Sequence, residues 1–251
     1  MSTLRKFLQL VTRLARIGLR RPRDLRHVLG TALHEAGQIE DPAVDVRRIP
    51  AIAVAQLLNS GDSRITTQFF LGVPASISIL EAYALALLMR RIRAKEVFEF
   101  GTYKGVSTTQ LALNLEPGGT VHTLDLPDEE DPAWQLEISK ASERQIAAER
   151  GKGALIPAEL RPRIDFLRRD SAQFDPAPFT GRIDLVFVDG AHSADYVRND
   201  SEKGWAMLRR GGILAWHDFA PNHRDVVQYV LGCGFAPQRV EGTSLAFATK
   251  P

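Results

Sequence analysis

The stretch EVFEFGTYKGVSTTQLAL, residues 96–113, decides the fold that this chain is expected to adopt. Its first five residues form a short apolar and aromatic run, which predicts a β-strand, and a helix is predicted from about Val106. Gly101 and Gly105 lie between the two, and glycine adopts the backbone conformations that a sharp turn requires. The same glycines would allow the backbone to approach a ligand closely, or allow the strand and the helix to pack tightly. Both interpretations stay open.

Short β-branched or aromatic runs alternate with helix-length segments from residue 96 onward, which is typical of repeated β-α-β units. The chain is therefore expected to form a doubly wound, Rossmann-like α/β sheet that is mostly parallel, with a C-terminal antiparallel strand pair. Strands are predicted at 96–100, 119–126, 163–170, 182–190 and 211–219, and the pair at 235–240 and 244–250. Helices are predicted at 131–151, at 193–210 with Gly211 as the C-cap, and near 223–232.

Residues 1–93 contain helical segments interrupted by prolines and show no alternating strand pattern. We therefore predict two parts, a helical N-terminal arm and cap at residues 1–93 and a main domain at residues 94–251. Residues 1–27 hold eight Lys or Arg and one acidic residue, and their apolar side chains fall on one helical face. This basic helix is expected to pack on its own domain, to form a homodimer contact, or to touch an anionic membrane surface peripherally.

The composition excludes several classes of protein. The net charge of +2 is due to residues 1–27, because the remaining chain has 24 basic and 29 acidic residues. Nucleic-acid-binding domains gather positive charge over a working face, so no nucleic-acid partner is expected. Cys233 is the only cysteine, which excludes an intrachain disulfide and a cysteine metal cluster and suits the reducing cytoplasm. No uninterrupted apolar run reaches the length of about 18 residues that a membrane span needs.

Polar side chains follow the predicted strands at their carboxyl ends, where doubly wound sheets bind ligands. Asp125 ends the second strand, 24 residues after Gly101, and a carboxylate there can accept hydrogen bonds from both hydroxyls of a ribose. Asp170 and Ser171 end the third strand and could contact an adenine amino group and ring. Capping a helix is an equally ordinary role for each of these side chains.

The fourth and fifth strands end in residues suited to acid–base chemistry. Asp189 follows a buried apolar strand, and His192 lies three residues further on; with a pKa near neutrality, His192 could take a proton from a hydroxyl nucleophile. Asp218 ends the fifth strand at the same edge of the sheet. Asp189 and Asp218 together could hold Mg²⁺, which prefers oxygen ligands, with His217 and Asn222 as candidate helpers. A metal-free site in which the carboxylates orient a cofactor or substrate is an equal alternative.

Two motifs, EFGTYKGVS at residues 99–107 and VDGAHSADYVRNDSEKGWAMLRRGGILAWHD at residues 188–218, resemble those of the class I S-adenosylmethionine-dependent methyltransferases. The similarity is to the catechol and caffeoyl-CoA type O-methyltransferases and a related bacterial family, and it covers residues 96–250. It implies S-adenosylmethionine as cofactor, with the first loop lining the methionine portion and Ser107 its carboxylate. The cofactor-binding residues expected on this basis are Glu99, Gly101, Thr102, Tyr103, Gly105, Ser107, Asp125, Asp170, Ser171 and Asp189.

The resemblance also implies methylation of a hydroxyl group on a small-molecule acceptor, with Asp189 and His192 as the catalytic residues. Asp189 and Asp218 match the two metal-binding aspartates of the family. The third ligand there is an amide residue directly after the second aspartate, and Phe219 occupies that position here. His192 stands where the catechol-type enzymes have a lysine base.

Two alternatives stay open from the sequence. One is a nicotinamide-dependent oxidoreductase on a similar sheet, which the missing middle glycine of a dinucleotide fingerprint disfavours. The other is a non-catalytic nucleoside-binding protein that docks through its basic N-terminal helix.

Overall fold

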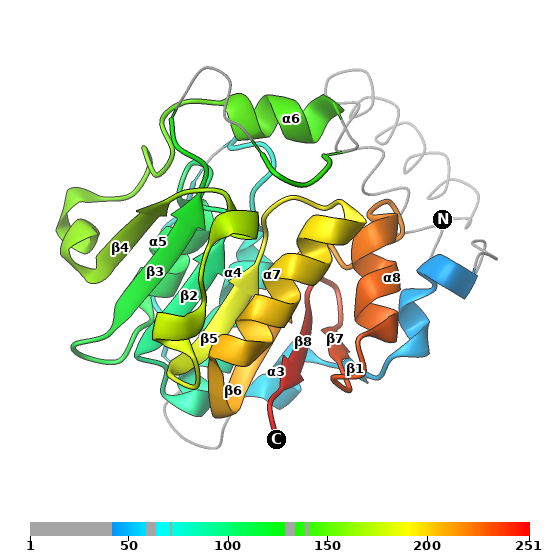
Figure 1. Ribbon diagram of the computed structural model, residues 1–251. Helices are drawn as coiled ribbons and strands as arrows, with labels where there is room; N and C mark the ends of the chain where they lie inside the picture. The colour runs from blue at the N-terminus through cyan, green and yellow to red at the C-terminus, as the bar shows by residue number, and fades with distance from the viewer. Residues whose placement is uncertain (1–41, 59–63, 71, 129–133, 139–140) are drawn as a thin grey trace, which may run out of the picture.

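The computed structural model describes residues 42–58, 64–70, 72–128, 134–138 and 141–251. Eight strands in these residues form one sheet, in the order β1-β7-β8-β6-β5-β2-β3-β4 (Figure 1). The strands are β1 Ala51–Ile52, β2 Glu96–Phe100, β3 Thr120–Asp125, β4 Ile164–Arg168, β5 Ile183–Val188, β6 Leu208–Trp216, β7 Gln238–Val240 and β8 Ala246–Thr249. The helices are α3 Val54–Leu57, α4 Ile79–Ile92, α5 Val106–Leu113, α6 Ala141–Ala148, α7 Ala194–Met207 and α8 Arg224–Gly232.

The sheet is mixed and mostly parallel. β3, β2, β5 and β6 run parallel to one another, and β4 pairs parallel with β3. Among these eight strands, only β8 runs the other way, and it pairs antiparallel with both β6 and β7. The predicted fold class, a doubly wound sheet with a C-terminal antiparallel pair, is confirmed.

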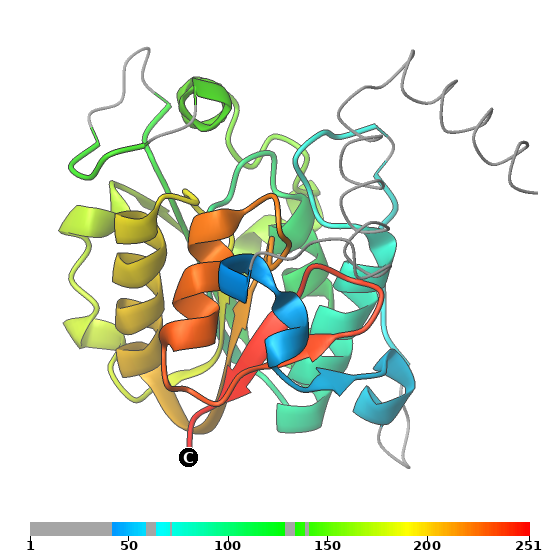
Figure 2. The same ribbon diagram turned by 90° about the vertical axis from the view of Figure 1, so that its right-hand side faces the viewer.

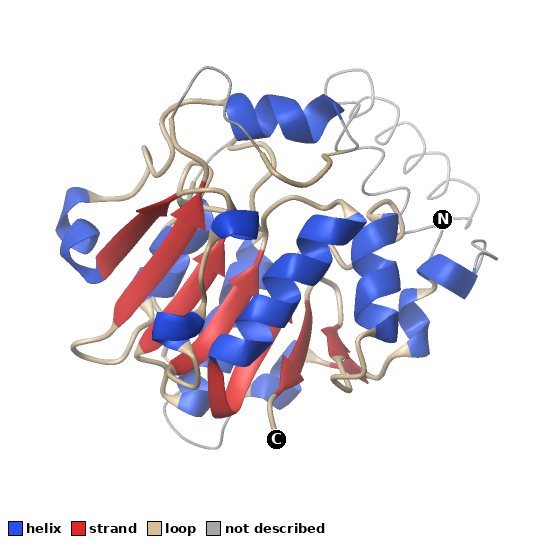
Figure 3. Ribbon diagram, in the orientation of Figure 1, coloured by secondary structure: helices blue, strands red, loops and turns tan. Residues whose placement is uncertain are grey.

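Side chains that alternate along the strands build two separate cores, one on each face of the sheet. In β2, Val97 belongs to the core shared with α4 and α5, whereas Phe98 belongs to the core shared with α7 and α8. In β5, Leu185 likewise belongs to the first of these cores and Val186 to the second. Figures 2 and 3 show the resulting three layers, with the sheet between the two groups of helices. Because both faces are buried, the strands read as continuous apolar runs in the sequence.

The segment before β2 contributes directly to this architecture. α4 begins at a capping box formed by Ser78 and Glu81, and its Leu85, Leu88 and Met89 are at most 1% exposed in the core that also contains Val97. β1, a two-residue strand that the sequence did not predict, pairs with β7. The boundary proposed at residue 93 remains a prediction. α4, which lies before that boundary, packs against one face of the sheet and shares a core with it.

Two predicted helices differ from the observed ones. A helix was expected at 131–151. Among the described residues of that range, α6 at Ala141–Ala148 is helical and 134–138 are not. The helix expected to end at Gly211 ends at Met207, because Leu208 already pairs with Ile183 of β5. Gly211, with a φ of 74°, therefore lies within β6, where the pairing register shifts, and does not cap a helix.

The basic helix predicted within residues 1–27 lies outside the described residues, and so do the contacts proposed for it. In the part of the chain that the structure describes, no helix has both the length and the apolar character needed to cross a bilayer.

Candidate functional site

The ends of β2, β5 and β6 meet at one edge of the sheet, where the strand order changes direction. The backbone N–H of Asp189 donates to the carbonyl of Phe100 at 2.9 Å, and that of His217 donates to the carbonyl of Val188 at 3.1 Å. These bonds extend the ladder beyond the strands and place the three following loops side by side. Such a switch point is where doubly wound sheets bind their ligands, and α6 lies above it in Figure 1.

The two glycines of the first loop are required by contacts within the protein. Gly101 has a φ of +96°, and a Cβ on it would lie 2.1 Å from the carbonyl oxygen of Asp189. Gly105 has a φ of +87°, and its Cβ would lie 2.4 Å from Cγ1 of Ile156. Tight packing, one of the two interpretations open from the sequence, therefore accounts for both glycines in this structure.

Glu99 is fully buried directly before this loop. Its Oε2 accepts hydrogen bonds from the hydroxyls of Thr108 and Thr123, at 2.5 and 2.6 Å, and Thr123 also bonds the Thr102 hydroxyl at 2.7 Å. Burial raises the pKa of Glu99 to about 7, against the opposing hydrogen bonds from Ser107 and the two threonines. Its Oε1 has no hydrogen-bond partner among the described residues. A buried carboxylate oxygen without a donor fits the ammonium group of an amino-acid ligand.

Asp125 ends β3 beside the same loop. Its two oxygens each accept one backbone N–H at 2.7 Å, from Tyr103 and from Leu126. Burial raises the pKa of Asp125, and Lys152 opposes that shift. An ionised carboxylate offers about four acceptor positions, so the acceptor capacity for two ribose hydroxyls remains.

Asp170 and Ser171, the residues predicted to contact adenine, carry several internal contacts. Asp170 caps the short helix Ser171–Gln173 by accepting the Ala172 N–H, which is the alternative role noted from the sequence. Its other oxygen accepts the Gln135 N–H at 2.6 Å and the Tyr196 hydroxyl at 2.9 Å. The carbonyl of Ser171 accepts from the Lys203 ammonium.

His192 lies between two carboxylates. Its Nε2 is 3.0 Å from Asp218 Oδ2, and its Nδ1 is 3.5 Å from Glu143 Oε1 of α6. Burial would lower the pKa of His192, but Asp218 and Glu143 outweigh burial and raise the pKa to about 10. The ring is thus cationic at neutral pH, unlike the near-neutral pKa expected from the sequence.

His217 is surrounded by three carboxylates. Its Nδ1 lies 3.0 Å from Asp189 Oδ1 and 3.6 Å from Asp218 Oδ1, and its Nε2 lies 3.3 Å from Glu81 Oε2. Burial would lower the pKa of His217, but the charges of Asp189 and Asp218 raise it well above its ordinary value. Burial would raise the pKa of Asp218, but His217 and His192 lower it well below its ordinary value.

Glu81 of α4 is a member of this site that the sequence analysis did not predict. Besides contacting His217, it accepts the N–H and the hydroxyl of Ser244 at 2.9 and 2.7 Å, and the N–H of Ser78 at 2.7 Å. Its burial would raise its pKa, but His217 and these hydrogen bonds lower it. The only sequence signal was a single acid within an apolar helix.

The predicted magnesium ligands, Asp189 and Asp218, lie close together. The imidazole of His217 lies beside them. One oxygen of each carboxylate and one ring nitrogen of His217 all lie within 4.8 Å of one another. Phe219, which replaces the amide ligand of the related enzymes, is 3% exposed and belongs to the core beneath α8. Mg²⁺ prefers oxygen ligands in octahedral geometry and keeps several waters, so the two carboxylates are suitable ligands for it, whereas the imidazole is not a ligand that it favours. The magnesium site expected from the sequence stays a prediction.

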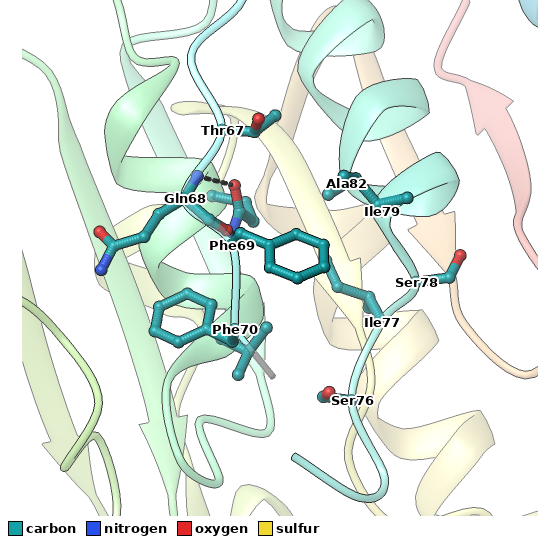
Figure 4. Close-up of a pocket in the computed structure, with 11 residues that line it drawn as sticks. Thr67, Gln68, Phe69, Phe70, Ser76, Ile77, Ser78, Ile79 and Ala82 are labelled. Atoms are coloured by element: carbon teal, nitrogen blue, oxygen red, sulfur yellow. Dashed lines mark hydrogen bonds between the residues drawn. The ribbon is translucent and has the colours of Figure 1, made fainter. Parts of the chain in front are cut away.

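A pocket lined by both polar and apolar residues lies between the start of α4 and α5 (Figure 4). Phe69 is 66% exposed and directs its ring toward Ile77 and Ile79. The pocket is close to the site on two sides, since Val106 follows the glycine loop and Ser78 donates to Glu81. Its lining residues are Thr67, Gln68, Phe69, Phe70, Ser76, Ile77, Ser78, Ile79, Ala82, Val106 and Gln110.

Two side-chain amides of α5 and the residue after it hold one wall of this pocket in place. The Gln110 amide accepts the Gln68 N–H at 3.2 Å and donates to the Gln68 carbonyl at 2.6 Å. Asn114 makes the same pair of bonds to Thr66, at 3.0 and 2.8 Å. Gln110 and Asn114, one helical turn apart, thus bond the backbone N–H and carbonyl of Gln68 and Thr66. A neighbouring β-strand would bond an extended segment in the same way.

Comparison with known proteins gives matches over the same region. Residues 98–219 match the family described as "Methyltransferase domain". A catechol O-methyltransferase from Mycobacterium tuberculosis is 28% identical over 141 residues, which cover 55% of this chain and 54% of that protein. Catechol O-methyltransferase domain-containing protein 1 from Mus musculus is 29% identical over 174 residues, covering 68% and 56%. The chain therefore spans little more than half the length of these relatives.

The fold is also similar to that of a cofactor-bound protein from MTB whose crystal structure is known. The two share a TM-score of 0.52 and 20% identity, over 70% of this chain and 82% of the other. At that identity the similarity concerns the fold alone.

Proposed function

We propose that this chain is a class I S-adenosylmethionine-dependent methyltransferase that transfers a methyl group from that cofactor to a hydroxyl group of a small molecule. The match of residues 98–219 to the family described as "Methyltransferase domain" supports the proposal. One observation carries the proposal. The bond from the Asp189 N–H to the Phe100 carbonyl fixes the candidate cofactor loop beside the cluster of Asp189, His192 and Asp218. The methyl group of the cofactor and the hydroxyl group of the acceptor would then lie close together at the ends of β2, β5 and β6.

The cofactor would lie over the ends of β2, β3 and β4. Glu99, with its unpartnered oxygen, would receive the ammonium of the methionine portion, and Asp125 would receive the ribose hydroxyls. Asp170 and Ser171 would lie near the adenine, although Asp170 has fewer acceptor positions left than Asp125. The loop residues proposed to line the methionine portion are Gly101, Thr102, Tyr103, Gly105 and Ser107.

The reaction would be an in-line displacement in which the oxygen of the acceptor attacks the methyl carbon and the sulfonium leaves as a neutral thioether. The contribution of the protein would be to position the two reactants and to accept the hydroxyl proton. We propose His192 as that base. Because the effect of burial is outweighed by Asp218 and Glu143, which raise the pKa of His192 to about 10, the imidazolium must first release its own proton to solvent before the ring can accept the proton of the hydroxyl group. Turnover should therefore rise with pH toward the pKa of His192.

The acceptor would enter from the pocket between α4 and α5. Phe69 and Phe70 offer aromatic surface there, and Thr67 and Ser76 offer hydroxyl groups. We therefore propose an acceptor with an apolar or aromatic body whose hydroxyl group reaches the cluster at His192.

The direct test is transfer of isotope-labelled methyl groups to a panel of phenols and other small hydroxyl compounds, together with calorimetric binding of S-adenosylhomocysteine. Asp125→Ala should weaken cofactor binding, whereas His192→Ala should lower kcat with cofactor binding nearly unchanged. Asp165→Ala removes an exposed carboxylate from the adjacent strand and serves as the control.

Two other results would overturn the assignment. Binding of NADH in place of S-adenosylhomocysteine would indicate the oxidoreductase alternative. Cofactor binding with no methyl transfer to any acceptor would indicate a binding protein.

A further inference from the structure

We infer that Lys152 is a positioning residue for the cofactor. Its buried ammonium group holds the end of α6 in place and stabilises the carboxylate of Asp125, which is proposed to receive the ribose hydroxyls. The inference rests on the proposed function, since it concerns the same cofactor. It assigns a role to a residue that lies outside both sequence motifs on which the family resemblance depends.

The surroundings of Lys152 are unusual for a lysine. Its side chain is 2% exposed, whereas lysine is almost never fully buried unless its charge is paired. Its ion pair with Asp128 is long, at 3.9 Å between Nζ and Oδ1, and the Asp128 side chain is 43% exposed. An exposed carboxylate at that distance offsets little of the cost of burying an ammonium group. The burial of this charge therefore needs a further explanation.

The ammonium group binds the C-terminal end of α6. Lys152 Nζ donates to the carbonyls of Ala147 and Glu149, at 2.9 and 3.0 Å. Carbonyls at the end of a helix have no N–H partner within it, and a positive charge is favourable there. Gly151, with a φ of 79°, lies in the turn that brings Lys152 back to the helix that it follows.

The same segment is bonded to the candidate cofactor loop and to the strand beside it. The Gly153 N–H donates to the carbonyl of Tyr103 at 2.7 Å, and the Tyr103 N–H donates to Asp125 Oδ2 at 2.7 Å. Arg168 is paired with Asp125 in the register of β3 and β4, and it donates to the carbonyl of Lys152 at 3.2 Å. Contacts from the loop and from β4 thus fix Lys152 beside Asp125.

The charge of Lys152 acts on Asp125. Burial raises the pKa of the Asp125 carboxyl, and Lys152 is the strongest influence that opposes the rise, ahead of the hydrogen bonds from Tyr103 and Leu126. An ionised carboxylate is only an acceptor, whereas a protonated one carries a donor in place of an acceptor. Both ribose hydroxyls donate to Asp125 in the proposed complex. The charge of Lys152 therefore favours the form of Asp125 that can receive them.

α6 extends the effect across the site. The helix lies above the ends of the strands in Figure 1, and Glu143 in its first turn accepts the His192 N–H at 3.2 Å. Glu149, directly after the helix, accepts the Tyr103 hydroxyl at 3.1 Å. One end of this segment thus contacts the proposed base, the other contacts the cofactor loop, and Lys152 holds the second end.

The test compares S-adenosylhomocysteine with its 2′-deoxyribose analogue, which lacks one of the two hydroxyls. Calorimetry on the full chain, without acceptor, should give a ratio of the two Kd values of about 10 to 100, the contribution of a hydrogen bond to a charged group. Lys152→Met has similar length and no charge. It should lower that ratio about 3- to 10-fold, since a buried charge contributes more than an exposed one.

Hydrogen exchange gives a measurement that needs no ligand. In Lys152→Met, the His192 amide, which donates to Glu143, should exchange faster because the end of α6 is no longer held.

Two further variants separate the charge of Lys152 from its hydrogen bonds. Lys152→Arg keeps a positive charge and should retain most of the Kd ratio. Lys152→Gln keeps N–H donors and loses the charge, so it should lower the ratio, and it replaces Lys152→Met in the comparison if that variant does not fold. Circular dichroism and thermal unfolding check the fold of each variant.

Lys250→Met is the matched control. Lys250 Nζ also donates to two backbone carbonyls at the end of a helix, those of Trp205 and Leu208, at 2.7 and 2.8 Å. The carbonyl of Lys250 accepts the N–H of Gly211 in the first half of β6, whereas the site lies beyond the other end of that strand. Its substitution should lower stability and leave the Kd ratio and the exchange at His192 unchanged.

The inference is overturned if Lys152→Met weakens both ligands by the same factor or weakens neither, or if Lys250→Met lowers the ratio as much. Unchanged exchange of the His192 amide in Lys152→Met would contradict the hold on α6. Failure of the unmodified chain to bind S-adenosylhomocysteine would contradict the proposed function itself. Binding with a ratio that does not depend on Lys152 would contradict this inference and leave the proposed function standing.

Discussion

Gly101 has no room for a side chain, because the backbone of Asp189, directly after β5, lies where its Cβ would be. Its φ of +96° adds a second obstacle, since side chains other than that of glycine rarely tolerate it. We expect Gly101→Ala to lower the free energy of unfolding by more than about 3 kcal/mol, which is beyond the range for left-handed strain alone. Urea denaturation measures the difference.

The control for that substitution is Gly118→Ala. Gly118 has a φ of +77°, but nothing lies within 4 Å of the position that a Cβ would occupy, so only the backbone strain of about 1–2 kcal/mol applies. Equal losses in the two variants would show that the contact with β5 is unimportant.

Asp200 shows the effect of burial on a single carboxyl group. Burial raises its pKa to about 7, against hydrogen bonds from Ser171 and Asn199. Because the folded-state pKa exceeds the unfolded-state value of about 3.9, this group stabilises the fold fully below pH 4, and that contribution is lost as the pH rises through 7. Thermal unfolding of Asp200→Asn should therefore depend less on pH between about 4 and 7 than that of the unmodified chain.

Glu202→Gln removes an exposed carboxylate from the same helix and should leave that pH dependence unchanged. A slope identical in the unmodified chain and in Asp200→Asn would contradict the assignment to Asp200.

At the scale of elements, the pairing of α5 with the segment before α4 carries a prediction of its own. Gln110→Leu removes both partners of the Gln68 backbone. Because Gln68 is exposed and water can replace them, we expect a loss of about 0.5–1.5 kcal/mol per hydrogen bond. We expect hydrogen exchange of the Gln68 amide to accelerate and KM for the acceptor to rise, with little change in cofactor affinity.

Gln228→Leu makes the same substitution at an exposed position of α8, and it should alter neither quantity. Unchanged exchange at Gln68 in Gln110→Leu would show that the amide pairing does not hold this segment.

The strands were predictable because local sequence determines them. β2 matches its predicted bounds, since four of its five residues are buried, on alternate faces of the sheet, and three of these are large and apolar. The end of α7 was predicted wrongly because the pairing of Leu208 with Ile183, a tertiary contact, outweighs the local preference for a glycine cap at Gly211.

The candidate site was predictable in part for the same reason. Asp125, Asp189 and Asp218 could be placed at one edge because each lies at the end of a predicted strand. The contact of Glu81 with Ser244, 163 residues away, depends on how α4 packs under the C-terminal strands, and no local pattern encodes it. The raised pKa of His192 likewise depends on Glu143 of α6, a helix whose position the sequence did not reveal.

At the scale of the whole molecule, a ligand that binds only the folded chain stabilises both cores together. S-adenosylhomocysteine at about 100 times its Kd should add about 2.7 kcal/mol, which raises Tm by several degrees for a chain of this size. Differential scanning fluorimetry measures the shift, and Asp125→Ala should reduce it. A shift with NADH but not with S-adenosylhomocysteine would contradict the cofactor assignment.

The position of β8 in the sheet has a consequence for biosynthesis. Because β8 lies between β6 and β7, the strands β7 and β1 cannot join the growing sheet until residues 246–249 have left the ribosome. Ser244, which anchors Glu81, emerges just before them. The imidazole and carboxylate groups of the site therefore acquire their final arrangement only after residues 244–249 have been synthesised, when the strands β2 to β6 have already had time to pair.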